Sequence, residues 1–316
     1  MPIDEEAALA PPGTANLPTR RSLLKLGGSA ALGLGAFAIA ACETSSSNSS
    51  PGTTASAAGG TSILDKWLST KKAKLGVDLT FPPIQFKDSN GKPTGYQMEL
   101  TAQMMSDLGV TPEYVEIPFG QLFAGLVAGK FDMMGISATI LPSRAIQGLF
   151  SNFPVFYESI VMLLKPGSTV TSSSQLNKSG VTLALLQGSS QEFSSHALFP
   201  SASYAPFAAI ADAVNDVATG RADAVVLSEF DVDSSLTAHP DLKLLSGPPL
   251  WVDANTYLMP LGDYKLQAWV NNWLRYNATH QALVAGWKKW LGPGLKKYNL
   301  ITYGVGPGTE PELVTP

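Results

Sequence analysis

Cysteine and histidine are scarce in this sequence. The only cysteine among the 316 residues is Cys42, so an internal disulfide and a cysteine-based zinc site are both excluded. The three histidines, His196, His239 and His280, are far apart and lack the spacing of a metal site. We therefore predict no metal and no cofactor, and we interpret each histidine as a surface residue or as one with satisfied hydrogen bonds.

An excess of basic residues is also missing. The chain has 21 lysines and arginines against 25 aspartates and glutamates, which gives a net charge of −4 at pH 7. Surfaces that bind nucleic acid are basic, so we expect no nucleic-acid partner. With 45% hydrophobic and 15% charged residues, the composition is that of an ordinary globular protein, and the length is sufficient for two domains.

Long apolar runs are absent near the N-terminus. The weakly apolar residues 26–41 form a run shorter than the ~20 residues that a membrane-spanning helix needs. The sequence TRRSLLK at residues 19–25 precedes this run and resembles a twin-arginine export signal, with Leu23 in place of phenylalanine. A charged flank before a short apolar core is typical of a targeting segment, so we exclude it from the fold.

The apolar run ends in the sequence IAAC, whose last residue is Cys42. This ending resembles a lipobox, in which small residues precede the cysteine that receives a lipid. We predict residues 1–42 to be a signal with a lipobox and Cys42 to be lipidated; the alternative is a cleaved signal in which the cysteine is incidental. Residues 43–61 are rich in Ser, Thr, Ala and Gly, which predicts a flexible linker. The predicted location is the periplasm or the outer face of the cell membrane, with a lipid anchor.

Beyond the linker, short apolar segments alternate with amphipathic ones. In the first half we predict three strands and two helices, at residues 75–79, 114–117 and 131–136 and at residues 96–108 and 121–128. Asn90-Gly91 predicts a hairpin turn with positive φ at both positions. The pattern restarts with strands at residues 181–186, 224–227, 242–245 and 256–260 and with helices that begin at residues 189 and 210. Alternating strands and helices predict parallel sheets with right-handed crossovers.

The two series of elements predict two α/β lobes. We expect lobe 1 at residues 62–158, lobe 2 at 159–254, a return to lobe 1 at 255–292 and a C-terminal tail at 293–316. The crossings between the lobes are expected near residues 154–165 and 253–262. Ligands of open α/β sheets bind beyond the carboxyl ends of the strands, so two facing lobes predict a cleft that a ligand closes.

Six sequence motifs occur in a characteristic order along residues 62–292. They are FPPIQF at 81–86, GKPTGYQMEL at 91–100, LFAGLVAGKFD at 122–132, TILPSR at 139–144 with FSNFP at 150–154, LQGSSQE at 186–192 and GRADA at 220–224. In this order they resemble the periplasmic amino-acid-binding proteins of ABC importers, the bacterial extracellular solute-binding proteins of family 3. The resemblance implies a two-lobed, type II periplasmic-binding-protein fold with a hinge and an interlobe cleft. It also implies a monomer that binds an amino acid or a related small carboxylate and delivers it to an ABC transporter permease.

The same resemblance implies a set of ligand contacts. Arg144 would hold the ligand's carboxylate, because a guanidinium donates two parallel hydrogen bonds to a carboxylate. Ser189 and Ser190 begin a helix whose free amides and positive dipole end suit an anion, while capping by Ser189 is a compatible structural alternative. Further implied contacts are Asp78, Phe81, Phe119, Ser137 and Thr139.

Three positions depart from the family pattern: Ile84 and Leu141 replace a common phenylalanine and a common threonine, and the third is Ser228. Ser228 stands where members usually have an aspartate that pairs with the ligand's ammonium group. A desolvated ammonium without a carboxylate partner is unfavourable, so we expect Glu229 or Asp231 to supply the charge, or the ligand to lack an α-ammonium group.

Two other functions are compatible with the sequence. Cyclohexadienyl and arogenate dehydratases resemble these receptors, and Asp231 lies near the position of a general acid. The predicted tether favours delivery of a solute, and no nucleophile–base pair is visible, so we predict a receptor that is not an enzyme. A surface sensor or adhesin with the same fold is the third possibility.

Overall fold

The computed structural model describes residues 61–298 and residue 300, which all belong to one unit of the chain. The predicted export signal, Cys42 and the predicted linker up to residue 60 lie outside the described residues, as do residues 301–316. Among the described residues, no helix is both long and apolar enough to cross a membrane.

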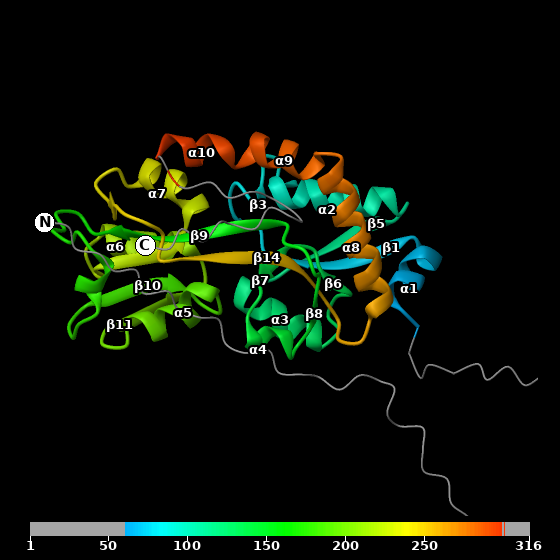
Figure 1. Ribbon diagram of the computed structural model, residues 1–316, viewed down its shortest axis with the longest axis horizontal. Coiled ribbons are helices and arrows are strands. Elements are labelled where there is room, and N and C mark those ends of the chain that lie inside the picture. Colours follow the sequence, from blue (N-terminus) through cyan, green and yellow to red (C-terminus); the bar gives the residue numbers. More distant parts are fainter. Residues whose placement is uncertain (1–60, 299, 301–316) are drawn as a thin grey trace, which may run out of the picture. The chain divides into compact units, whose positions relative to one another are not determined.

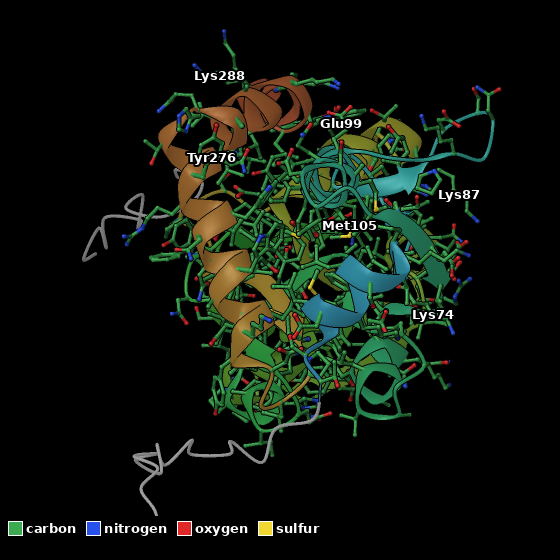
Figure 2. The ribbon with its side chains drawn as sticks, turned by 90° about the vertical axis from the view of Figure 1, so that its right-hand side faces the viewer. Lys74, Lys87, Glu99, Met105, Tyr276 and Lys288 are labelled. Carbon is green, nitrogen blue, oxygen red and sulfur yellow. The ribbon has the colours of Figure 1, made fainter. Side chains whose placement is uncertain are left out.

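Lobe 1 is built on a parallel sheet with the strand order β5-β1-β6. Its strands are β1 (Lys72–Val77), β5 (Thr111–Glu116) and β6 (Met133–Met134), and its first three helices are α1 (Ile63–Thr70), α2 (Tyr96–Asp107) and α3 (Phe119–Val127). Leu75 and Val77 of β1 are fully buried, as are Met104 and Met105 of α2. Met105 lies in the interior, whereas Lys288 of the C-terminal helices points outward (Figure 2). Leu75 of β1 therefore shares a core with Met104 and Met105, whereas Val77 belongs to a second core with residues of α3.

A small antiparallel sheet follows β1. Its strands are β2 (Thr80–Phe81), β3 (Gln85–Lys87) and β4 (Pro93–Thr94). The predicted turn lies between β3 and β4, but of its two central residues only Gly91 has a positive φ, at 76°. The prediction was wrong for Asn90 because the Asp88 carboxylate accepts hydrogen bonds from the backbone N–H groups of Asn90 and Lys92, at 2.9 Å each, and so fixes a different turn.

Lobe 2 contains the parallel strands of a larger, eight-stranded mixed sheet. These strands are β10 (Thr182–Leu186), β11 (Ser203–Phe207) and β12 (Ala224–Ser228), with β10 in the middle. Its helices are η1 (Ser173–Leu176), α5 (Ser190–Leu198), α6 (Ile210–Ala218), η2 (Glu229–Asp231) and α7 (Val232–Ala238). The apolar face of α6 packs on β10 and β12, where Val214 and Val217 join the core of the lobe.

Two long antiparallel strands connect the lobes. They are β9 (Phe156–Leu164) and β14 (Trp251–Met259), of nine residues each, and they run side by side in Figure 1. Toward lobe 2, β9 pairs with β12 and with β13 (Lys243–Leu244). Toward lobe 1, β14 pairs with β7 (Ser137–Thr139) and β8 (Leu149–Phe150). The sheet is therefore mixed where only parallel pairing was predicted, because these hinge strands add antiparallel pairs to it.

Three helices complete the described chain. They are α8 (Tyr264–Thr279), α9 (Ala282–Trp290) and α10 (Gly292–Lys297). The first two pack on lobe 1, where α8 contacts α1 and α9 contacts α2. Residues 293–297, predicted as part of a tail, are helical, since Pro293 lies in the first turn, where its missing N–H group is not needed. Helix α10 contacts α7 and η2 of lobe 2, so the C-terminal helices touch both lobes.

Candidate functional site

A pocket lies between the lobes, with the hinge strands at its base. Lobe 1 contributes Asp78, Thr80, Phe81, Gln85, Gln97, Phe119, Ser137 and Thr139; the hinge contributes Phe156, Glu158 and Asn255; lobe 2 contributes Leu186, Ser189, Ser190, Gln191, Ile210, Ser228 and Asp231. All the predicted ligand contacts except Arg144 and Glu229 are among these lining residues. The structure thus brings together residues that the sequence places in several separate motifs.

Asp78 organises the wall of the pocket on lobe 1. Its carboxylate accepts hydrogen bonds from the backbone N–H groups of Thr80, at 2.9 Å, and Phe119, at 2.7 Å. The end of β1 is thereby tied to the start of α3, where the Phe119 ring packs edge-on against Phe123 at 5.7 Å between centroids. Asp78 therefore positions an aromatic wall of the pocket.

Several buried polar atoms of lobe 1 have no partner within the described protein. Gln97 accepts a hydrogen bond from the backbone N–H of Ser137 through Oε1, at 2.7 Å, which leaves its Nε2 as an unused donor. The Ser137 hydroxyl and Gln85 Oε1 are likewise unpaired. Buried polar groups without partners are unfavourable, so these atoms mark where a polar ligand would bind. Neither glutamine was among the predicted contacts, although both lie within the first two family-like motifs.

Arg144 links the two lobes. It lies in the short helix α4 (Pro142–Ala145), is 4% exposed and donates hydrogen bonds to the carbonyl oxygens of Thr139, at 2.9 Å, and Gly188, at 2.8 Å. Its guanidinium carbon lies 4.3 Å from the centre of the Phe123 ring. Burial lowers the pKa of Arg144 to about 10, so the group stays charged at neutral pH. The side chain is not among those that line the pocket, and its predicted role as a carboxylate clamp stays a prediction.

The lobes also meet backbone to backbone where α3 approaches the loop before α5. A Cβ atom on Gly188 would lie 2.8 Å from the Cα of Gly120, and Gly188 has a φ of +74°. A Cβ atom on Gly120 would lie 3.1 Å from the carbonyl oxygen of Gln187. Only residues without side chains allow this close approach of α3 to the loop before α5.

The two serines at the start of α5 have different partners. Ser189 is the N-cap: its Oγ accepts a hydrogen bond from the Glu192 N–H at 3.2 Å, so the capping alternative is observed. Ser190 instead donates to Asp253 Oδ2 at 2.6 Å. The Thr139 hydroxyl lies 3.3 Å from Ser190 Oγ and 3.5 Å from the same Asp253 oxygen. A carboxylate of the hinge therefore occupies the place beside Ser190 and Thr139.

A second carboxylate of the hinge faces the first. Glu158 of β9 is the direct partner of Asp253 of β14, and its Oε2 accepts a hydrogen bond from Asn255 at 2.7 Å. Burial and the neighbouring Asp253 raise the pKa of Glu158 to about 7, although hydrogen bonds from Ser228 and Asn255 oppose this. Burial also raises the pKa of Asp253. Glu158 thus brings a carboxylate to Ser228, the position where the family's usual aspartate is missing.

The structure separates the two acids that were predicted to replace that aspartate. Asp231 lines the pocket, and burial, followed by the nearby Glu158, raises its pKa well above the usual range. Glu229 lines a different cavity beside Phe230 and Trp290, and its Oε1 accepts a hydrogen bond from the Ser159 N–H at 3.0 Å. Burial raises the pKa of Glu229 to about 8. Within the part of the chain that the structure describes, no group of His, Cys, Asp and Glu has the arrangement of a metal site.

The sequence model of the bacterial extracellular solute-binding proteins, family 3, matches residues 73–293. The chain belongs to this family. The match confirms the resemblance noted in the sequence. The type II fold is confirmed as well by solved structures, among them an ancestral amino acid-binding protein described as a precursor of cyclohexadienyl dehydratase. That structure has a TM-score of 0.66 and 28% identity, and the alignment covers 72% of this chain and 99% of the other.

Two curated relatives are similar over shorter stretches. A probable amino-acid ABC transporter periplasmic-binding protein of Sinorhizobium fredii is 31% identical over 146 residues, which are 45% of this chain and 49% of the relative. The lysine/arginine/ornithine-binding periplasmic protein of Escherichia coli is 28% identical over 169 residues, which are 53% of this chain and 64% of the relative. The chain therefore spans about half to two thirds of the length of these two relatives.

Proposed function

We propose that this chain is an extracytoplasmic solute receptor that binds an amino acid or a related small polar molecule between its lobes and delivers it to an ABC transporter permease. One observation carries the proposal: a single pocket is lined by side chains from lobe 1, from lobe 2 and from the hinge strands that connect them. The relatives named as amino-acid-binding proteins of ABC transporters support the same function.

Such a receptor needs the ligand to favour the closed arrangement of the lobes. Gln97 and Ser137 of lobe 1 and Asp231 of lobe 2 all face the pocket, so one ligand can bond to both lobes at once. A ligand that makes these bonds only when the lobes are together shifts the equilibrium toward closure. The bond between Arg144 and the Gly188 carbonyl and the approach of Gly120 to Gly188 add direct contacts to that closed state.

Location and anchoring belong to the same proposal. The twin-arginine-like signal and the lipobox ending at Cys42 support a receptor at the outer face of the cell membrane, held by a lipid. A receptor tethered there acts as a monomer beside its permease and captures solute before transport.

A binding screen with the purified full-length chain tests the receptor function. The thermal midpoint is measured with each standard amino acid, with deaminated acids, with opine-like compounds and with amines, and every hit is titrated by calorimetry. We expect at least one compound to bind with a Kd near or below about 1 μM, which corresponds to about −8 kcal/mol. Absence of binding across the whole panel would contradict the proposal. For delivery, deletion of the gene is expected to abolish uptake of the bound compound by cells.

A specific observation favours one second candidate, a dehydratase. Asp231 lines the pocket, and burial, followed by the nearby Glu158, raises its pKa well above the usual range, which is the direction that a general acid needs. Incubation of the chain with prephenate or arogenate tests this candidate. Turnover that is lost in Asp231→Asn would establish the enzyme, and no turnover leaves the receptor function.

A further inference from the structure

The pocket carries an excess of acidic side chains. Its lining residues include the acids Asp78, Glu158 and Asp231, but no lysine, arginine or histidine. Asp78 already accepts two backbone N–H bonds, whereas Glu158 and Asp231 are buried near each other and have raised pKa values. Their carboxyl groups are available to a positively charged ligand, which would favour the ionised form of both.

Ser190, which was expected to contact a ligand's carboxylate, already donates a hydrogen bond to a carboxylate that belongs to the chain. Asp253 accepts a hydrogen bond from Ser190 at 2.6 Å, at the first turn of α5, and its Oδ2 lies 3.5 Å from the Thr139 hydroxyl. The charge of Arg144 lowers the pKa of Asp253 and so partly offsets the effect of burial. Both terminal nitrogens of Arg144 are bound to backbone carbonyls. Asp253 therefore occupies the Ser190 hydroxyl, lies beside the Thr139 hydroxyl and favours the charged form of Arg144.

We propose that the ligand of this pocket is an organic cation without a carboxylate group, such as a linear amine or guanidine. In this proposal, the Asp253 carboxylate fills the place that the carboxylate of an amino acid would otherwise take. This inference rests on the proposed receptor function and narrows its ligand. A ligand carboxylate beside Ser190 would face Asp253 at close range, and two like charges in a buried site disfavour each other.

The rest of the pocket suits a cation with a carbon chain. Phe81, Phe119 and Phe156 provide aromatic surface, over which an ammonium or guanidinium is attracted by the ring face. Gln85 Oε1 is a buried acceptor without a partner in the described protein, so it can accept an N–H bond from such a group. Glu158 and Asp231 supply the opposite charge that a desolvated cation needs.

Matched pairs of compounds test the inference on the unmodified full-length chain. Lysine is compared with cadaverine, ornithine with putrescine and arginine with agmatine, because the members of each pair differ only in the α-carboxylate. Calorimetric titration at pH 7.5 is expected to give at least tenfold tighter binding of the amine in at least one pair. Equal affinities in every pair, tighter binding of the amino acids, or binding of neutral amino acids alone would overturn this inference and leave the receptor function standing. If no compound of the full panel binds, both fail.

A variant series identifies Asp253 as the cause. Asp253→Asn keeps the shape and removes the charge, so the affinity ratio of amine to amino acid is expected to fall at least tenfold. The matched control is Asp65→Asn on α1, which removes one charge from a surface ion pair with Lys265 of α8 and is expected to leave the ratio unchanged. If Asp253→Asn does not fold, Asp253→Ser takes its place. An unchanged ratio in a folded Asp253 variant would overturn the assignment.

Discussion

Asp253 of β14 and Glu158 of β9 are direct partners in the antiparallel pair that forms the hinge. Side chains at such positions point to the same face and lie about 5 Å apart at their Cβ atoms. Both residues are buried, with 8% and 5% of their surface exposed. Like charges in this arrangement oppose folding, and buried acids with raised pKa values are typical of functional sites. Glu158 of the hinge strands therefore lines the pocket directly beside a second buried acid.

The first prediction concerns the stability of the free protein at different pH values. Glu158 and Glu229 have folded-state pKa values of about 7 and about 8, raised from 4.5 mainly by burial. Over this pH range, the folded state binds more protons than the unfolded state. The free energy of unfolding is therefore expected to fall as pH rises from 5 to 8. Each group contributes at most about 1.4 kcal/mol per pH unit to this fall. Burial also raises the pKa values of Asp231 and Asp253, which contributes to the slope with the same sign, whereas the charge of Arg144 lowers the pKa values of Glu158 and Asp253. Urea unfolding at each pH measures the slope.

Glu158→Gln is the control for that slope. The variant removes one of the titrating groups and keeps the side-chain volume, so its stability is expected to depend less on pH over the same range. A free energy of unfolding that rises between pH 5 and 8, or a variant with the same slope as the parent, would contradict the assignment.

The second prediction concerns the pH dependence of binding. An organic cation favours the ionised forms of Glu158 and Asp231, so its binding releases protons below about pH 7. Its affinity is expected to rise between pH 5.5 and 7.5, by up to about tenfold per pH unit for each proton released. Titrations in two buffers with different ionisation enthalpies count the protons. A ligand that binds more tightly at pH 5.5 would instead be an anion.

Much of the fold follows from local sequence patterns. The strand predicted at residues 181–186 is β10 (Thr182–Leu186), and the helix predicted at 96–108 is α2 (Tyr96–Asp107). Strand β1 (Lys72–Val77) begins three residues before its predicted start at 75, because Lys72 and Lys74 alternate with buried residues at the edge of the apolar run. Strand β9 was missed because Glu158 and Ser159 interrupt an apolar run, although all nine of its residues are buried.

The lobe residues of the candidate site were predictable from the family resemblance. The motifs contain Thr139 and the serines of α5, and Asp78, Phe119 and Ser137 lie within three residues of a motif. Glu158 and Asp253 lie outside all six motifs, and they meet only because two strands about a hundred residues apart pair in one register. No local pattern encodes such pairing. The acid that sequence analysis sought beside Ser228 was therefore expected from η2, while the structure also supplies Glu158 from the hinge.

The third prediction is the loss of ligand-induced stabilisation in Arg144→Ala. The variant removes the bonds to Thr139 and Gly188 and leaves Asp253 without the neighbouring positive charge. The increase in thermal midpoint on adding the ligand is expected to disappear. Arg275→Ala is the matched control, since Arg275 is an exposed arginine that also lies over a phenylalanine ring, that of Phe153 at 5.1 Å. An unchanged midpoint increase in Arg144→Ala would remove this residue from the binding function.

The fourth prediction tests the membrane tether. Cys42 is the only cysteine, so Cys42→Ser removes the only thiol to which a lipid can be attached. The variant is expected to move from the membrane fraction to the soluble fraction of cells, while ligand binding by the purified protein is unchanged. Immunoblots of fractionated cells measure the distribution. Continued membrane association of Cys42→Ser would argue against lipidation.

The fifth prediction separates lobe closure from backbone strain. Gly188→Ala places a Cβ atom 2.8 Å from the Cα of Gly120 at a φ of +74°, so it both strains the loop and holds the lobes apart. Gly180 has a similar φ of +82°, and no atom of the described residues lies within 4 Å of the position that its Cβ would take. Gly180→Ala therefore causes backbone strain of about 1 kcal/mol without a steric clash between the lobes. Both variants are expected to lose similar stability, whereas only Gly188→Ala loses affinity, by at least tenfold. Small-angle scattering with ligand is expected to show a larger radius of gyration for Gly188→Ala. Equal affinities of the two variants would mean that the contact between Gly120 and Gly188 is not part of the ligand-bound state.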